Sequence, residues 1–236
     1  WIDGTCVARQ GKSLLPKTLS PRVNKFHATA KKASDFDIPA GQGKLRLIEA
    51  LDGQIVTHAS ETEALVADGM AWANPDQDIL KITVVNRYKN TTPSVAFVRG
   101  FGLKQGAIAS SVAHDCHNIV AVGTSNEDLA RAVNLLIENE GGIAVRGPSG
   151  DEEVLPLPVA GLMSDGYAED VAAGYARLTK NVQAMGSPLG APFMTLSFLA
   201  LLVIPSLKLS DLGLFDGENF RFVPVFTGEP SLEKKD

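Results

Sequence analysis

Cysteine and histidine are both scarce in this chain of 236 residues, which contains two cysteines and four histidines. Cys6 and Cys116 lie far apart in the sequence. They could form one bridge, but two residues cannot build the dense disulfide framework of a small secreted domain. They also lack the close spacing of paired zinc ligands. We therefore expect a reduced, cytoplasmic protein.

Positive charge and long apolar runs are scarce as well. Lysine and arginine number 22 against 27 acidic residues, which gives a formal net charge of −5 at pH 7. Proteins that bind the phosphate backbone of nucleic acids normally carry a basic excess, so we expect no nucleic-acid partner. The longest apolar run, 196–205, is about half the length of a membrane-spanning helix and contains Ser197. We expect no membrane partner and no leader peptide.

The first forty residues differ from the rest of the chain. The chain opens at Trp1 without a methionine, and Asp3-Gly4 between two short apolar pieces predicts a hairpin over 1–8. Because this start is abrupt, we expect a piece of a longer polypeptide. Residues 11–40 are rich in Lys, Ser, Pro and Asn, so we expect a connector that is partly helical around 21–34. A regular pattern begins at Lys44, which places the connector at 16–43 and the main domain at 44–236.

The main domain shows strand patterns followed by helix patterns. Runs rich in β-branched residues predict strands at 45–50, 54–58, 78–88, 94–100, 107–113, 119–123, 143–146, 153–159, 221–223 and 225–226. Helical spacing predicts helices at 126–140, 169–185 and 192–202, the first capped by Ser125 or Asn126. The middle of the domain has β-β-α-β-β-α order. This order favours an α+β fold, with layered mixed or antiparallel sheets and helices packed on them, over a doubly wound fold.

The densest group of polar side chains lies between two apolar runs. It comprises Ser110, Ser111, His114, Asp115, Cys116, His117 and Asn118. Polar groups between buried strands are costly to desolvate unless each finds a partner, and proteins tolerate that cost mainly where a site needs it. The histidines could ligate a metal or transfer protons, with Asp115 orienting a ring, and the serines could bind a heteroaromatic ligand. The alternative is a tight turn whose polar groups only satisfy the backbone.

Known metal-site motifs are missing. The chain has no His-Glu-x-x-His, and no His-x-Glu followed by Pro-Cys-x-x-Cys. Four histidines leave too few obvious ligands for a complete two-metal centre. Either this chain does not carry a metal, or carboxylates supply most of the ligands.

Three other patterns each allow a structural explanation. The glycine-rich run 100–106 lacks the Gly-Lys-Ser/Thr ending of a phosphate loop, so its glycines are expected to allow bends between strands. Cys116 could act as a nucleophile with a neighbouring histidine as base, or pack as a small apolar residue. Pro156 and Pro158 cannot both lie in a central strand, so 155–164 is expected to be an edge or irregular segment. That segment could line a pocket or an interface, or form a rigid passage.

Four of these stretches together resemble the C-terminal region of bacterial adenine deaminases, members of the amidohydrolase superfamily. The stretches are GFGLKQGAIASSVAHDCHN at 100–118, LPLPVAGLMS at 155–164, PFMTLSFLAL at 192–201 and VIPSLKLSD at 203–211. The resemblance covers nearly all of residues 44–226. One departure is Cys116, where the family is expected to carry serine. This small change weakens the idea of a cysteine nucleophile.

The resemblance implies hydrolysis of adenine to hypoxanthine and ammonia. In this superfamily, hydroxide supplied by a divalent metal ion attacks the amine-bearing ring carbon, while acidic and histidine side chains move protons. The metal, manganese, iron or zinc, is held in a TIM-type barrel whose His-x-His strand has no counterpart here. The chain is therefore expected to follow that barrel, with 1–15 as a remnant of its small flanking β-domain. We expect no complete barrel and no tightly bound metal in the chain itself.

The resemblance also gives the polar run a role. It is expected to reach the mouth of the barrel and to complete the adenine pocket. The candidate catalytic residues are His114, Asp115 and His117, and the candidate substrate-binding residues are Ser110, Ser111 and Asn118. The expected partners are adenine, the barrel of the same polypeptide and further copies of the chain. Two alternatives stay open: a non-catalytic domain for stability or oligomerisation, and an independent metallohydrolase that uses the two histidines and Asp115.

Overall fold

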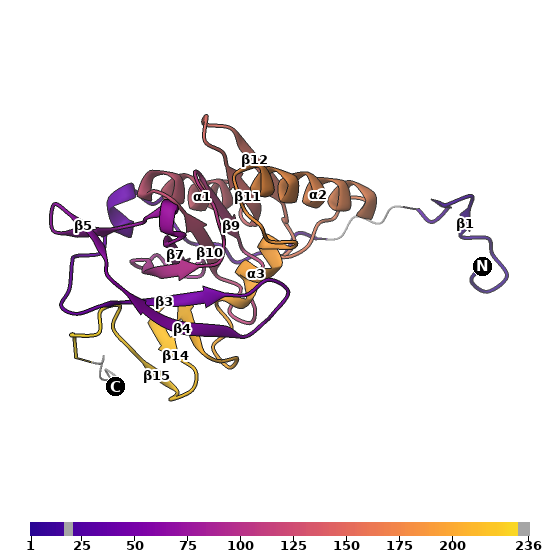
Figure 1. The fold of residues 1–236 in the computed structure, drawn as a ribbon. Helices are drawn as coiled ribbons and strands as arrows, with labels where there is room; N and C mark the ends of the chain where they lie inside the picture. Colours follow the sequence, from indigo (N-terminus) through magenta and orange to yellow (C-terminus); the bar gives the residue numbers. More distant parts are fainter. Residues whose placement is uncertain (17–20, 231–236) are drawn as a thin grey trace.

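The computed structural model describes residues 1–16 and 21–230, and its centre is an eight-stranded sheet (Figure 1). The strand order is β12-β11-β9-β10-β7-β8-β3-β4, and only the pair β3 and β8 is parallel. The strands are β3 (Leu45–Ala50), β4 (Thr57–Thr62), β7 (Leu80–Val85), β8 (Ser94–Arg99), β9 (Ala107–Ser110), β10 (Ile119–Gly123), β11 (Gly142–Arg146) and β12 (Glu152–Pro156). Over the described part of the chain the sheet stays open and forms no barrel, so the predicted α+β architecture is confirmed.

Both faces of the central strands are buried. In β10, Ile119 and Ala121 belong to the apolar cluster around α1, whereas Val120 and Val122 belong to the cluster on the opposite face. Successive side chains of a strand point to opposite faces, so a strand covered on both sides is apolar throughout. This explains why the strand at 119–123 was predicted with its observed bounds.

Helices and a small sheet cover the two faces. One face carries α1 (Asn126–Glu138) and the short 3-10 helix η1 (Ala33–Phe36). The other carries α2 (Ala168–Ala184), α3 (Pro192–Phe198) and a three-stranded sheet of β13 (Leu207–Ser210), β14 (Gly213–Asp216) and β15 (Arg221–Phe222). The Oγ of Ser125 accepts a hydrogen bond from the amide of Asp128 at 3.1 Å, so the predicted cap of α1 is Ser125.

The glycine-rich run forms bends, as predicted. Gly100, Gly102 and Gly106 have φ values of 103°, 65° and 78°, in the left-handed region that favours glycine. The carboxylate of Asp78 accepts hydrogen bonds from the amides of Gly100 at 2.8 Å and Gly102 at 2.7 Å. These two amides already have an acceptor, which argues further against a phosphate loop. The proline-bearing strand β12 lies at the edge of the sheet, also as predicted.

Several short elements differ from the sequence prediction. The strands β5 (Leu65–Ala67), β6 (Met70–Trp72), β13 and β14 and the 3-10 helix η2 (Pro75–Gln77) were not predicted, because such short runs show no clear period. The strand predicted at 54–58 begins only at Thr57, and the helix predicted at 192–202 ends at Phe198. The prediction of helix around 21–34 is wrong. Residues 21–32 form neither helix nor strand, and the short 3-10 helix η1 begins only at Ala33.

The N-terminal strands β1 (Ala8–Arg9) and β2 (Lys12–Ser13) form a separate hairpin, which lies apart from the main body (Figure 1). Its turn is formed by Gln10 and Gly11, both at positive φ, rather than by Asp3-Gly4. The latter pair closes only a single bridge between Ile2 and Thr5. None of the helices in the described residues is long and apolar enough to cross a membrane.

Candidate functional site

We call residues 111–118 the polar turn, and it joins β9 to β10 at one edge of the main sheet. Because neighbouring strands here are antiparallel, β7 and β9 end at this edge and β10 and β11 begin there. Five of the six predicted site residues lie on the polar turn, and Ser110 directly precedes it. The structure therefore places all six predicted residues at the same edge of the sheet.

The two serines fasten the beginning of the polar turn. The Oγ of Ser110 accepts a hydrogen bond from the amide of Val112 at 3.0 Å. The Oγ of Ser111 accepts one from the amide of Gly142 at 2.8 Å and donates one to the carbonyl of Gly161 at 2.6 Å. Both serines are buried, with at most 1% of their surface exposed. This geometry gives them a role in holding the turn; direct binding of a purine by either serine stays a prediction.

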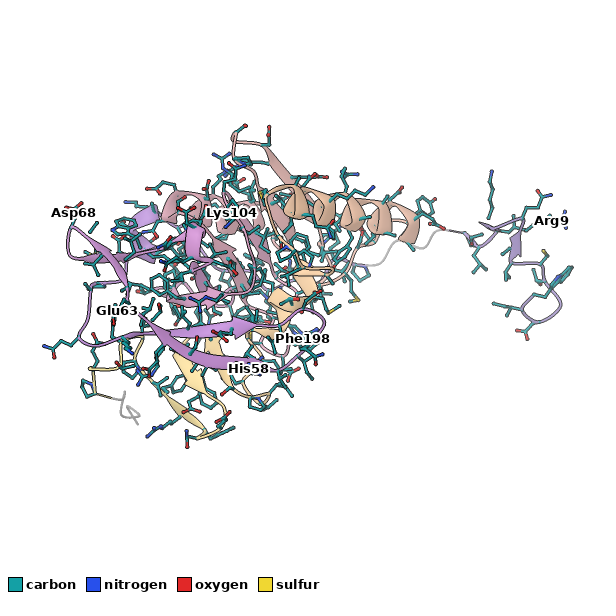
Figure 2. The ribbon with its side chains drawn as sticks, in the orientation of Figure 1. Arg9, His58, Glu63, Asp68, Lys104 and Phe198 are labelled. Carbon is teal, nitrogen blue, oxygen red and sulfur yellow. The ribbon has the colours of Figure 1, made fainter. Side chains whose placement is uncertain are left out.

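His114 is anchored on α3. Its amide donates a hydrogen bond to the carbonyl of Ser197 at 3.1 Å. Its ring packs against the ring of Phe198, with 4.7 Å between the centroids and a tilt of 38°; Phe198 is labelled in Figure 2. The ring of His114 is half-buried, and the next residue, Asp115, is exposed. A polar ring held on an aromatic platform is thus presented at the surface.

His117 closes the polar turn. Its amide donates to the carbonyl of Ala113 at 2.7 Å, and its φ of 51° lies in the left-handed region that histidine enters more readily than bulky apolar residues do. Burial, then the charges of Arg87 and His114, lower the pKa of His117 below its ordinary value, and Asp115 opposes this. The ring is therefore biased towards its neutral form, in which one nitrogen donates and the other accepts.

Asn118 belongs to the buried frame. Only 3% of its surface is exposed, and its Oδ1 accepts a hydrogen bond from the amide of Arg87 at 3.3 Å. The structure thus divides the six predicted residues into two groups. Ser110, Ser111 and Asn118 are buried, whereas His114 and His117 are half-buried and Asp115 is exposed. Only the second group can meet a ligand without a rearrangement of the turn.

A pocket of about 370 Å³ lies beside the polar turn. Its walls are mostly apolar, but Asp115 and Asp211 add carboxyl groups and Cys116 adds a thiol. The lining residues are Asp115, Cys116, Ala200, Leu201, Leu202, Val203, Ser210, Asp211, Leu212 and Phe222. Apolar walls with a few polar groups are typical of small-molecule sites. The polar turn therefore forms one wall of a surface pocket whose other walls come from the segment after α3, from the end of β13 with the residues that follow it, and from β15.

Cys116 is a poor candidate nucleophile. Cys116 is half-buried, and this burial is the main cause that raises the pKa of its thiol above the ordinary value. A raised pKa leaves less thiolate at neutral pH, and the thiolate is the nucleophilic form. Cys116 packs against the apolar cluster of α2 and α3. Both Cys6 and Cys116 are free, so the bridge that the sequence allowed is not formed.

Two residues at this edge were missed by the sequence reasoning. Arg87 follows β7 and bonds Asn118, and Asp211 follows β13 and lines the pocket beside Cys116. The carboxylate of Asp211 accepts a hydrogen bond from the Nδ2 of Asn86 at 2.7 Å. A signal for Arg87 existed, because polar residues come directly after the apolar strand at 80–85. Asp211 ends the stretch 203–211, but nothing local connects it to the polar turn.

A larger hollow of about 430 Å³ lies between β11, β12 and α2. Its glutamates are already paired with arginines: Glu152 with Arg131 at 2.7 Å, and Glu153 with Arg177. Their charges are balanced, so the polar turn is the better candidate site. Among the residues that the structure describes, no group of three His, Cys, Asp or Glu side chains is arranged to hold a metal ion. The described residues therefore give no support to the interpretation of the chain as an independent metallohydrolase.

Sequence comparison identifies the class of protein to which this fold and turn belong. The family model of the adenine deaminase C-terminal domain matches residues 54–221, and the chain belongs to this family. The resemblance inferred from the four sequence stretches is thereby confirmed.

Three relatives illustrate the relationship. The adenine deaminase of Salinibacter ruber is 53% identical over 228 residues, which are 96% of this chain and 42% of that protein. That of Sulfurovum sp. is 50% identical over 223 residues, 94% of this chain and 40% of the relative. That of Methanosarcina barkeri is 44% identical over 237 residues, 97% of this chain and 43% of the relative. The chain spans about two fifths of the length of these relatives.

Proposed function

We propose that this chain is the C-terminal part of an adenine deaminase, and that it takes part, with a preceding barrel, in the hydrolysis of adenine to hypoxanthine and ammonia. The observation that carries the proposal is the polar turn. Three titratable side chains lie at least partly exposed at one edge of the sheet, on a frame held by buried serine and asparagine side chains. The greater length of the relatives named adenine deaminase supports a function shared with a preceding domain.

In this proposal His114, Asp115 and His117 bind the purine edge and move protons. Adenine offers ring nitrogens as acceptors and an exocyclic amine as donor. A neutral imidazole can pair with either, because one of its nitrogens donates and the other accepts. The lowered pKa of His117 favours this form. Asp115 contributes an exposed carboxylate that can accept a hydrogen bond from the amine.

The divalent metal ion of the superfamily, manganese, iron or zinc, belongs in this proposal to the barrel. The described residues of this chain offer no group of three suitable ligands, so they do not fit such an ion. The part assigned to this chain is therefore limited to binding the purine, orienting it and moving protons.

Replacement of the two histidines tests the proposal. In the full-length enzyme, with the barrel joined to this chain, we expect His114→Ala and His117→Ala each to lower kcat/KM for adenine by about 10²-fold or more, the usual contribution of a general acid or base. The measurement is steady-state kinetics with adenine. His58→Ala is the matched control, because His58 is exposed on the outermost strand β4 (Figure 2) and should leave the kinetics unchanged. Unchanged kcat and KM in both turn variants would refute the proposal.

A second candidate function is a non-catalytic domain for stability or oligomerisation. The buried state of Ser110, Ser111 and Asn118 favours it, because these groups bond the protein's own backbone. This function requires the polar turn to be closed throughout. The exposed Asp115 and the adjoining pocket argue against that requirement, so we rank this function second.

A further inference from the structure

The guanidinium of Arg87 is buried next to the polar turn, and no described residue supplies a counter-charge. Only 3% of the residue's surface is exposed. Among the described residues no carboxylate lies within ion-pair distance of it. Burying an unpaired charge normally costs several kcal/mol, so a position that keeps one needs an explanation.

The side chain is held by neutral groups from three segments. Its Nη1 donates to the carbonyl of Ala160 at 2.6 Å, and its Nη2 donates to the Oη of Tyr88 at 3.0 Å. Its Cζ lies 4.7 Å from the ring centre of Tyr88 and 5.9 Å from that of Phe26. Among the residues that the structure describes, none accepts a hydrogen bond from the buried Nε. The positive charge is thus solvated by dipoles and ring faces but not cancelled, so its field reaches nearby groups.

The backbone of Arg87 joins the polar turn to the segment at 27–28. Its amide donates to the Oδ1 of Asn118 at 3.3 Å, and its carbonyl accepts from the amides of His27 at 2.6 Å and Ala28 at 3.2 Å. The carbonyl of Gly161, next to the one that Arg87 bonds, accepts from the hydroxyl of Ser111. Arg87 and Ser111 therefore hold the two ends of the polar turn against one loop.

We propose that Arg87 is a positioning residue for the polar turn: it locks the His117–Asn118 end against the loop at 158–161, and its uncancelled charge disfavours a second positive charge on the imidazole of His117. The effect of Arg87 on catalysis rests on the function proposed above. Its role in holding the turn does not depend on that function.

The charges that act on His117 can be named. Arg87, which follows β7, and His114 lower its pKa in addition to burial, and Asp115 raises it. Asp211, from the loop after β13, acts on the neighbouring Cys116. Arg87 is the only permanent cation of this set, because arginine stays protonated in proteins. Its removal should therefore raise the pKa of His117, while burial continues to hold that pKa down.

An NMR titration of this chain tests the electrostatic half. The chain has only four histidines, and a His117→Asn variant identifies the ring signal of His117. We expect the pKa of His117 to rise in Arg87→Gln and to rise less in Arg87→Lys, which keeps the charge. Arg46→Gln is the matched control. Arg46 also donates hydrogen bonds to backbone carbonyls, those of Pro224 and Phe226, but it lies on β3, which is separated from β9 and β10 by other strands of the sheet. An unchanged pKa in a folded Arg87→Gln, or an equal rise in Arg87→Lys, overturns the proposal.

Hydrogen exchange tests the positioning half and remains decisive if Arg87→Gln does not fold. A lysine cannot bond Ala160 and Tyr88 with a planar fork. We expect Arg87→Lys to lose protection at the amides of 159–163 and 117–118, whereas Arg46→Lys keeps it. Equal protection in both variants overturns the proposal. In the full-length enzyme, the acidic limb of kcat/KM should move to higher pH in Arg87→Gln. If the pKa of His117 rises in the NMR titration but the acidic limb of kcat/KM does not move, the proposed function fails and the positioning role of Arg87 stands.

Discussion

Lys81 and Lys208 are the most deeply buried lysines of the described residues, with 1% and 0% of their surface exposed. Lys81 donates to the carbonyl of Phe36 at 3.0 Å and to the Oδ1 of Asn126 at 2.8 Å. Lys208 has a single acceptor among the described residues, the carbonyl of Ile55 at 2.7 Å. Because burial penalises the charged form, the pKa of each lysine falls to about 8.

The lowered pKa of Lys208 predicts a pH-dependent stability. Between pH 8 and its ordinary pKa of 10.5, the unfolded chain keeps a proton that the folded chain has lost. The free energy of unfolding therefore rises with pH in this range, by at most about 1.4 kcal/mol per pH unit for one proton. Lys208→Met removes this contribution and should reduce the slope. Urea unfolding at a series of pH values measures it.

The control for this prediction is Lys44→Met, because Lys44 is exposed and its removal should leave the slope as in the wild type. A Lys208→Met protein with the wild-type slope would contradict the prediction, because it would show that Lys208 has the same pKa in the folded and the unfolded chain.

At the scale of elements, the polar turn depends on contacts to neighbouring segments. Its own hydrogen bond, from His117 to Ala113, spans only one turn. Ser111 connects it to the start of β11 and to the loop at 158–161, and His114 connects it to α3. The position of the exposed side chains is therefore determined by elements distant in sequence.

Removal of the Ser111 hydroxyl should loosen this frame. Ser111→Ala leaves the amide of Gly142 without its acceptor in a buried place, and we expect a loss of about 1–3 kcal/mol in the free energy of unfolding. Urea denaturation measures the change. Ser149→Ala, on an exposed turn, serves as the matched control and should change stability little. Equal stability of the two variants would contradict the role assigned to Ser111.

The elements that the sequence predicted well are those with a clear period and a local boundary signal. The helix at 126–138 begins at its Ser125 cap, and the strand at 119–123 is apolar on both faces. The misplaced or missed elements, such as the strands at 207–210 and 213–216, are too short to show a period. Their pairing decides their conformation, and pairing is a tertiary property.

At the scale of the whole molecule, the chain corresponds to about two fifths of the relatives named adenine deaminase. Its main sheet is open, and the described residues provide no group of three metal ligands. The candidate site lies at one edge of the sheet, where exposed groups can meet another domain. Under the proposed function, these residues therefore need a metal-holding barrel to complete an active site.

This expectation predicts that the isolated chain is inactive. The purified chain, incubated with adenine and with manganese, iron or zinc, should release no ammonia above the blank. The full-length enzyme assayed in parallel is the positive control. Metal-dependent turnover by the isolated, contaminant-free chain would contradict the assignment of the metal to the barrel.

The sequence by itself determined the α+β class, the main helices and strands, the family and the cluster of histidines, because each depends on residues that are close together in the chain. Only the tertiary structure decided which polar groups are buried and which are exposed. It placed Arg87 against Asn118, and it brought Asp211 to Asn86 across 125 positions of sequence. Burial and electrostatic fields depend on distance in space, so no local pattern could assign Ser111 to the frame or Arg87 to the environment of His117.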